Sequence, residues 1–402
     1  MMSSSLLGSS YYVLYSSNKD NKQNESSTTT IQTSTTSSQH SFWQEFQWSS
    51  NEKQSIVELL QQNEDKCDII ENSITPQRGQ FIIDKYEKDA QLHWNNFYSS
   101  HETNFFKDRH YLHKAFPDDF GILYQNNIGN GDDYQKERRI VVNSMSESFT
   151  ITEIGCGVGN TVLPLLELDP FVYIKKSSSS DNSDHDNVAN IYEKKELFIW
   201  GLDFSSVAIE LLKKDTRYIN ATTETIDRAR AQVWDITTTH PKDIYASKVV
   251  SSQPSQSKEV LQCLESSSNI SLLLFVLSAI SPDRMMQAAK NVASTLKPGG
   301  ILVLRDYGRY DEAQIKLGTS RNKRLSDNFY VKHDGTRCYY FTTEDIDRLF
   351  GQKKKSDCNE EEYEGAGLEV LQLKYVQRLY KNRADDATRR RVWVQARFRK
   401  PL

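Results

Sequence analysis

A glycine-rich turn constrains this chain more than any other feature of its sequence. Gly155, Gly157 and Gly159 follow a predicted β-strand and precede a predicted helix. Glycine lets the backbone turn sharply and approach a ligand closely. Asn160 stands where the dinucleotide-binding fingerprint would have its third glycine. The turn therefore predicts a nucleotide-like ligand without specifying it, and a tight turn with a purely structural role is the alternative.

Strand and helix patterns alternate on both sides of this turn. The run 271–277 (SLLLFVL) has the near-continuous hydrophobicity of a strand that is buried on both faces of a parallel sheet. Ser281 and Pro282 predict the start of a helix, with the serine as its N-cap. The alternation predicts an α/β fold with a doubly wound sheet. The predicted strands are 149–154, 197–202, 231–234, 271–277 and 301–304, the other predicted helices are 160–168 and 206–214, and 369–380 with 391–398 predict a terminal hairpin.

Two aspartates follow predicted strands at the edge where such sheets bind their ligands. Asp203 ends the second strand, where a carboxylate can accept both hydroxyls of a ribose, and Asp235 ends the third, where it can accept from an adenine amino group. The long distance from Gly155 to Asp203 is explained by a polar insertion of roughly 20 residues. Because the turn carries no lysine to hold phosphates, S-adenosylmethionine fits better than a nucleoside triphosphate.

The composition excludes several classes of protein. A net charge of −4 excludes a uniformly basic nucleic-acid binder but allows a local basic patch. The five cysteines are scattered, which predicts neither a disulfide framework nor a metal site. No apolar run is long enough to cross a bilayer, so we expect no membrane association. The N-terminus lacks the pattern of a secretory signal, so we expect a cytoplasmic protein, with mitochondria as the weaker alternative.

Three short blocks carry a more specific signal. FFKDR (105–109), RDYG (305–308) and DGTR (334–337) accompany the glycine turn, and the match spans about residues 85–401. With these blocks the chain resembles the eukaryotic methyltransferase-like enzymes that make 3-methylcytidine in tRNA. The segment SFWQEFQW (41–48) further resembles the branch that acts on threonine and arginine tRNAs.

The resemblance implies a fold, a reaction and partners. It implies a Rossmann-like, seven-stranded class I methyltransferase whose last strand is antiparallel, with S-adenosylmethionine as cofactor. The methyl group would go to N3 of cytidine 32 in the anticodon loop of threonine, arginine or serine tRNAs, with a possible helper such as an aminoacyl-tRNA synthetase. We expect a disordered Ser/Thr-rich tail over 1–41, a flap and tRNA-contact segment over 42–140, and a methyltransferase domain over 141–402 with polar insertions near 176–187, 251–257 and 354–364.

The resemblance also assigns residues to the cofactor. Trp94 and Tyr98 share one helix face and would cover the cofactor as a flap, although an aromatic packing stripe has the same spacing. The other expected cofactor-binding residues are Gly155, Gly157 and Gly159 at the methionine tail, Asp203 at the ribose, and Asp235, Ile236 and Leu274 at the adenine, with Phe275 in place of Leu274 if the strand ends one residue later.

Further residues are expected at the cytosine and along the RNA. Tyr307 could stack on a flipped cytosine, and Asp306 could stabilise the positive charge of the methylated ring. Arg305 could orient the O2 carbonyl, or pair with Asp306 instead. The residues expected to contact RNA are Phe105, Phe106, Lys107, Arg109, Arg337, Arg390 and Arg391, of which the last two belong to a basic terminal segment.

Two other functions compete with this one. A methyltransferase of the same fold could act on a protein or a small molecule, because the fold alone does not define the substrate. A non-enzymatic RNA-binding protein is the third possibility, and the complete glycine turn and both aspartates argue against it.

Overall fold

The seven central strands of the sheet follow the order of a class I methyltransferase. The computed structural model describes residues 43–64, 76–124, 139–143, 148–175, 190–250, 258–352, 365–381 and 388–402. The predicted tail and the three predicted insertions lie outside these residues. The central strands run β6-β5-β3-β9-β10-β15-β14. Their bounds are β3 Phe149–Ile154, β5 Asn190–Asp203, β6 Ala229–Val233, β9 Ser268–Leu274, β10 Leu296–Tyr307, β14 Glu369–Lys381 and β15 Thr388–Arg399.

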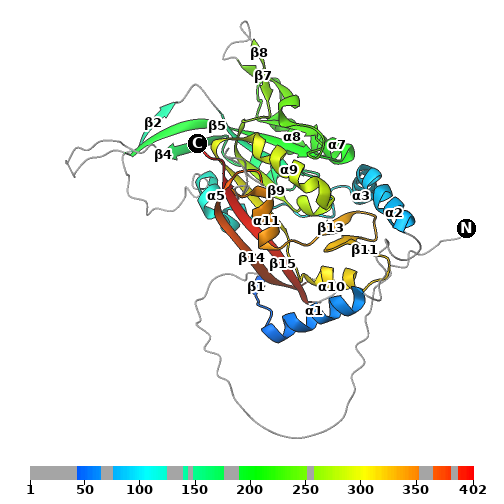
Figure 1. Ribbon diagram of the computed structural model, residues 1–402. Helices are drawn as coiled ribbons and strands as arrows, with labels where there is room; N and C mark the ends of the chain where they lie inside the picture. The colour runs from blue at the N-terminus through cyan, green and yellow to red at the C-terminus, as the bar shows by residue number, and fades with distance from the viewer. Residues whose placement is uncertain are drawn as a thin grey trace, which may run out of the picture. The chain divides into compact units, whose positions relative to one another are not determined.

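The directions of these strands confirm the predicted fold class. β3 pairs in parallel with β5 and β9, and β9 pairs in parallel with β10. β15 is antiparallel to both β10 and β14, so the last strand is the reversed one. β14 and β15 form the predicted terminal hairpin, which Figure 1 shows as two long orange and red strands.

Shorter strands extend this framework. β1 (Trp43–Glu45) pairs antiparallel with the edge strand β14, while β2 (Arg139–Asn143) and β4 (Phe171–Lys175) pair with β5. Two smaller sheets are separate from the large one. One is the hairpin of β7 (Tyr245–Val250) and β8 (Lys258–Cys263), and the other consists of β11 (Arg324–Ser326), β12 (Phe329–Val331) and β13 (Arg337–Tyr339).

Helices cover both faces of the sheet because the central strands are apolar on both faces. Along β5, Trp200 packs into the core under α9 and α11, while Ile199 packs into the core under α6, α7 and α8. This alternation follows from the two-residue period of a strand. The helix bounds are α6 Val162–Leu166, α7 Ser206–Lys214, α8 Thr216–Ala221, α9 Pro282–Thr295 and α11 Thr343–Phe350, with the single turns η2 Pro241–Asp243 and η4 Leu277–Ala279.

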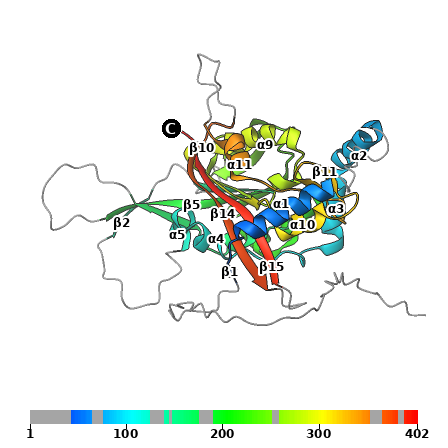
Figure 2. The same cartoon turned by 60° about the horizontal axis from the view of Figure 1, so that its bottom comes forward.

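The N-terminal helices pack around this domain. Figure 2 shows α1 beside α10, and Leu60 of α1 approaches Gly318 at the end of α10. Three apolar side chains of α2, Ile82, Ile83 and Tyr86, pack against the small sheet of β11–β13. The bounds are α1 Ser50–Glu64, α2 Pro76–Lys88, α3 Ala90–His101, α4 Leu112–Ala115, α5 Pro117–Tyr124 and α10 Glu312–Gly318. Among the described residues, no helix is both long and apolar enough to span a bilayer.

Two local predictions need correction. The strand predicted over 271–277 begins and ends three residues earlier, because the chain turns at Phe275, whose φ is 62°. Ser281 precedes α9 as predicted, but its side chain caps no backbone N–H. Its hydroxyl instead donates to Glu87 and accepts from Arg337. The helix start is therefore tied to α2 by a side-chain contact rather than by a cap.

Substitution of two leucines, one buried and one exposed, tests which residues form the hydrophobic core. Leu302 is fully buried in the centre of β10, whereas the Leu59 side chain on α1 is 40% exposed. We expect Leu302→Ala to lower the free energy of unfolding by about 2–5 kcal/mol, because it leaves a cavity between packed layers. Leu59→Ala is the matched control and should cost less than about 1 kcal/mol. Urea unfolding measures both, and equal losses would contradict this description of the core.

Candidate active site

A cavity of about 650 Å³ opens at the carboxyl ends of the central strands. Gly155 lines it after β3, Asp203 at the end of β5, Asp235 after β6 and Phe275 after β9. Open α/β sheets bind their ligands at this edge, and the volume is in the range of about 300–1,000 Å³ usual for small-molecule sites.

The three glycines of the turn have different tasks. All three have positive φ, namely 71° at Gly155, 55° at Gly157 and 92° at Gly159. Gly155 lines the cavity, and a Cβ there would lie 2.1 Å from Cγ2 of Val276. A Cβ at Gly157 would lie 2.6 Å from the hydroxyl of Tyr98. A Cβ at Gly159 would instead meet Leu212, so this third glycine serves helix packing, and of the three glycines only Gly155 lines the cavity.

Asp203 ties the turn to the end of β5. Its carboxylate accepts from the backbone N–H of Gly157 at 2.7 Å and of Ser205 at 2.8 Å. Burial raises the pKa of Asp203 to about 6, although these N–H donors oppose the shift. The side chain lines the cavity at the predicted ribose position and is mostly ionised at neutral pH.

A second buried carboxylate supports the turn from behind. Glu153 of β3 accepts from Arg109 at 3.1 Å and from the N–H of Val162 at 3.1 Å. Burial raises the pKa of Glu153 to about 7, and the charge of Arg109 opposes this shift. Arg109 also donates to Thr161 at 3.0 Å. The prediction of an RNA contact for Arg109 needs correction, because its guanidinium points inward to a carboxylate that requires a counter-charge.

The predicted aromatic flap lies in the cavity wall. Trp94 and Tyr98 of α3 both line the cavity, and their rings stack with centroids 6.0 Å apart. Burial raises the pKa of Tyr98 well above its usual value. Tyr98 also packs with Phe97 and Val158 in a small apolar cluster. The stripe therefore packs and lines the cavity at the same time, and its role as a flap over the cofactor stays a prediction.

Three residues were predicted to contact the adenine, and the structure places one of them outside the cavity wall. Asp235 and Ile236 line the cavity as expected, and Asp235 accepts from the backbone N–H of Thr237 at 2.9 Å. Leu274 does not line it, because this residue ends β9 and is buried in the core. Phe275 lines the cavity in its place. Of the two positions predicted beside the adenine, Phe275 therefore lies in the cavity wall and Leu274 does not.

The end of β10 lies behind the cavity wall. The Asp306 carboxylate is buried and accepts from the N–H of Ser278 at 3.0 Å, and burial raises its pKa to about 6. Tyr307 reaches the cavity only through Phe275, since their ring centroids are 5.1 Å apart. Arg305 donates to Gln395. Roles of these residues at the cytosine stay predictions.

The Arg305 guanidinium lies in an aromatic environment. It lies 5.3 Å from the ring centroids of Phe116 and Trp393 and 5.4 Å from that of Tyr111. Successive side chains of a strand point to opposite faces, which separates Arg305 from Asp306. Burial lowers the pKa of Arg305.

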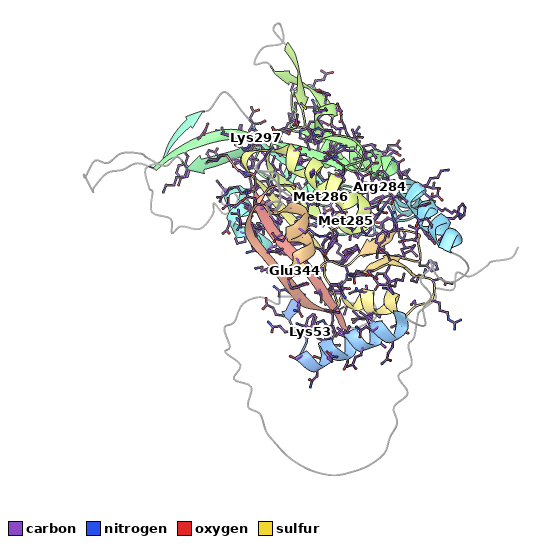
Figure 3. All side chains as sticks on the ribbon, in the orientation of Figure 1. Lys53, Arg284, Met285, Met286, Lys297 and Glu344 are labelled. Atoms are coloured by element: carbon purple, nitrogen blue, oxygen red, sulfur yellow. The ribbon has the colours of Figure 1, made fainter. Side chains whose placement is uncertain are left out.

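A charged cluster at the rim of the cavity was not predicted. Glu87 of α2 contacts Arg337 and accepts from Ser281, and Arg284 lies 3.1 Å from the same carboxylate. Figure 3 places Arg284 at the start of α9, on the side of α2. Arg337 is buried in this cluster and also lines the cavity, and its contact with RNA stays a prediction. No local motif marks Glu87 as its partner.

The remaining RNA candidates lie at the surface or close to it. Phe105, Phe106 and Lys107 are exposed in the loop after α3. Arg390 is exposed and lies 5.0 Å from the ring centroid of Trp48. Arg391 is only partly exposed, because it pairs at 2.8 Å with the buried carboxylate of Asp311. Arg391 therefore needs correction from a free RNA contact to a paired one.

The residues present fit S-adenosylmethionine. A glycine turn with positive φ, where an added Cβ would clash with neighbouring side chains, borders the space for a flexible tail at Gly155. A carboxylate lies at the end of β5 for ribose hydroxyls, and apolar Ile236 and Phe275 flank the part beyond it. In the described part of the chain no group of three His, Cys, Asp or Glu residues could hold a metal ion. Strand order and cavity together define a class I S-adenosylmethionine-dependent methyltransferase.

Comparisons with known proteins narrow this class. The tRNA N(3)-cytidine methyltransferase METTL2 of Xenopus tropicalis is 33% identical over 377 residues, which cover 90% of each chain. METTL2B of Homo sapiens, also named a tRNA N(3)-cytidine methyltransferase, is 31% identical with the same coverage. O-methyltransferase 3 of Dictyostelium discoideum is 28% identical over 89% of this chain and 83% of that protein. The chain belongs to the METTL2 family of tRNA N(3)-cytidine methyltransferases.

Other comparisons add less. No family model matches the chain. Among solved structures, a S-adenosylmethionine-dependent methyltransferase from Anabaena variabilis is 13% identical and covers 78% of this chain and 94% of that chain, with a TM-score of 0.40. The assignment of the fold therefore depends on the strand order and directions described above.

The close contact between Gly157 and Tyr98 can be tested directly. We expect Gly157→Ala to weaken S-adenosylmethionine binding by roughly tenfold or more, because the new methyl group strains the backbone and displaces the Tyr98 hydroxyl. Calorimetric titration with S-adenosylmethionine gives the affinity. Adding Tyr98→Phe should restore part of it.

A second glycine supplies the control. Gly121 lies in α5, and a Cβ there meets nothing within 4 Å. Gly121→Ala should therefore bind the cofactor like the wild type. If Gly157→Ala also binds it normally, the turn does not need glycine at this position.

Proposed function

We propose that this protein transfers a methyl group from S-adenosylmethionine to N3 of cytidine 32 in the anticodon loop of tRNA. The observation that carries the proposal is the cavity itself, bounded by the glycine turn, Asp203 and the aromatic face of α3. Membership of the METTL2 family supports tRNA cytidine as the acceptor. Position 32 and the geometry of transfer are inferred from the family resemblance of the sequence blocks.

The hydrogen bonding of the cavity carboxylates favours an acceptor that needs no general base. Asp203 accepts from backbone N–H groups, and Glu87 accepts from Ser281 and Arg337. Asp84 accepts from Gln80 at 2.7 Å, and Asp235 accepts from Thr237. Each carboxylate that lines the cavity within the described residues is thus engaged with the chain itself. Cytosine N3 has an in-plane lone pair and suits such a site, since no proton must be removed before the transfer.

The alternative is methylation of a hydroxyl group in a small molecule or a protein. The Dictyostelium discoideum relative that is named an O-methyltransferase favours this reading. A hydroxyl, however, must lose its proton during transfer, which calls for a base within hydrogen-bond reach. The relatives named tRNA N(3)-cytidine methyltransferases, which are 33% and 31% identical to this chain, favour the tRNA reaction over this alternative.

The protein would promote the methyl transfer mainly by aligning the reactants and by stabilising the charge that develops. S-adenosylmethionine would supply an electrophilic methyl group, which N3 accepts with its lone pair while the bonding electrons stay with the sulfur. Asp203 holds the ribose, and Trp94 with Tyr98 shields the bound nucleoside from water. Alignment of the acceptor lowers the entropic part of the barrier. The buried Asp306 carboxylate would favour the positive charge that develops on the cytosine.

The base must leave its stack before N3 is accessible, because pairing would occupy that atom. We propose that the flipped cytosine is received beside Tyr307, whose ring centroid lies 5.1 Å from that of the cavity-lining Phe275. We further propose threonine, arginine or serine tRNAs as substrates, an aminoacyl-tRNA synthetase as a candidate helper, and the cytoplasm as the compartment. Methylation assays with single tRNA transcripts, with and without a synthetase, separate these possibilities.

Substitution of Asp203 tests the cofactor assignment. We expect Asp203→Ala to lose detectable methylation, because the ribose loses its acceptor and the glycine turn loses its tie to β5. Affinity for tRNA should persist in a filter-binding assay. Mass spectrometry of tRNA nucleosides after incubation with labelled cofactor measures the product, and a tRNA with uridine at position 32 should remain unlabelled.

The matched control is Asp283→Asn, a change at an exposed aspartate in the first turn of α9. This variant should produce 3-methylcytidine at the wild-type rate. Full methylation by Asp203→Ala would refute the ribose role. If the label is found only in molecules other than tRNA, the result favours methylation of a small molecule or a protein.

The pKa of Asp203 predicts how cofactor affinity changes with pH. Its raised value of about 6 means that the carboxylate takes up a proton as pH falls through 6. A protonated acid accepts hydrogen bonds less well, so affinity should be flat from pH 8 to 7 and fall by up to about tenfold per unit below 6. Calorimetry over this range should show a flat profile for Asp203→Asn. A wild-type profile without this decline would contradict the assignment.

A further inference from the structure

An exposed aromatic cluster lies beside the cavity. We call Phe97, His101, Phe105 and Phe106 the aromatic platform. Phe105 is 54% exposed, yet its ring packs against Phe97 at 4.9 Å, His101 at 5.0 Å and Phe106 at 4.7 Å between centroids. All three contacts are edge-to-face, so neighbouring rings hold Phe105 in place although more than half of the residue is exposed.

The platform is fixed to the cofactor site. Asn160, next to the glycine turn, donates its side-chain amide to the carbonyl of Phe106 at 3.2 Å. The backbone N–H of Arg109 donates to the carbonyl of Asn160 at 2.7 Å. Phe97 contacts Tyr98 with ring centroids 5.3 Å apart, and Tyr98 lines the cavity. The loop that carries Phe105 therefore has a defined position relative to the reacting groups.

The size and charge of the platform indicate what it binds. A stable protein interface buries roughly 1,200 Å² or more, which two exposed rings cannot supply. One exposed phenylalanine face instead matches one nucleobase, and base–aromatic stacking is the usual way proteins hold unpaired RNA bases. Lys107 follows directly and is exposed, so a cation lies beside the rings for the phosphate of the stacked nucleotide.

We propose that Phe105 stacks on an unpaired nucleobase of the tRNA loop outside the target cytidine, with Lys107 near its phosphate. This inference rests on the proposed function and adds a second base contact to it. Phe97 and His101 of the platform lie on α3, which also carries Trp94 and Tyr98, so this helix would connect the cofactor site with the loop that contacts the RNA.

Three substitutions at Phe105 separate stacking from simple apolar contact. Phe105→Ala and Phe105→Leu both remove the ring, and we expect either to raise the KM for tRNA about tenfold or more with little change in kcat. Phe105→Trp keeps a ring and should stay within about twofold of wild type. Phe81→Ala is the matched control, because Phe81 is an exposed phenylalanine on α2 outside the platform. Calorimetric affinity for S-adenosylmethionine should be unchanged in all four proteins.

A double-mutant cycle identifies the stacked base. Anticodon stem-loop RNAs that each carry one abasic nucleotide are compared on the wild type and Phe105→Ala. At the stacked position the abasic RNA should bind both proteins equally, so the penalty of the substitution disappears there and persists at the other positions. Lys107→Ala should reduce the salt dependence of RNA binding.

The possible outcomes separate this inference from the proposed function. A wild-type KM for Phe105→Ala, or normal behaviour of Phe105→Leu, overturns the stacking role even when 3-methylcytidine is formed. A penalty that no abasic position removes would also overturn it and would indicate that Phe105 supports RNA binding without stacking on one base. Absence of 3-methylcytidine with the wild-type protein would instead reject the proposed function.

Discussion

The buried carboxylate of Asp203 is the interaction on which the site depends. It accepts backbone N–H groups from the glycine turn and from the start of α7, so a single side chain joins two strand ends and the loops that follow them. The buried Glu153 carboxylate likewise accepts a backbone N–H group, that of Val162, and Arg109 is its counter-charge. Removing either acid would leave buried N–H groups or a buried cation without a partner, which costs more than the bond itself contributed.

From this anchor the cavity is assembled out of distant parts of the chain. The strand ends supply the floor and the polar groups, and α3 supplies an aromatic wall. The cluster of Glu87, Arg337 and Ser281 then joins α2, the small sheet and α9 at the rim. Preorganisation of this kind suits a reaction in which the acceptor atom is already nucleophilic and the enzyme mostly has to align it.

Sequence patterns predicted the features that depend on neighbouring residues. They did not predict which acidic side chain pairs with which arginine. The glycine turn, Asp203 and Asp235 were predictable because each depends on a strand end and a few neighbours. The strand that contains Leu274 ends because Phe275 has a positive φ and turns the chain. The hydrophobicity of the sequence does not indicate this turn. Arg109, Arg337 and Arg391 resembled RNA contacts because their acids, Glu153, Glu87 and Asp311, lie 44, 250 and 80 residues away. Only the fold reveals such pairs.

The pairing of β1 with β14 has a consequence for handling the protein. β14 is the outer strand of the hairpin, and three residues, Trp43–Glu45, cover part of its free edge. An uncovered strand edge offers a row of free N–H and C=O groups to any other chain. Removing the residues up to 42 would leave β1 paired with β14. Removing the residues up to 45 would expose the edge of β14, which could then pair with strands of other molecules. Solubility, rather than catalysis, would then be the first property to suffer.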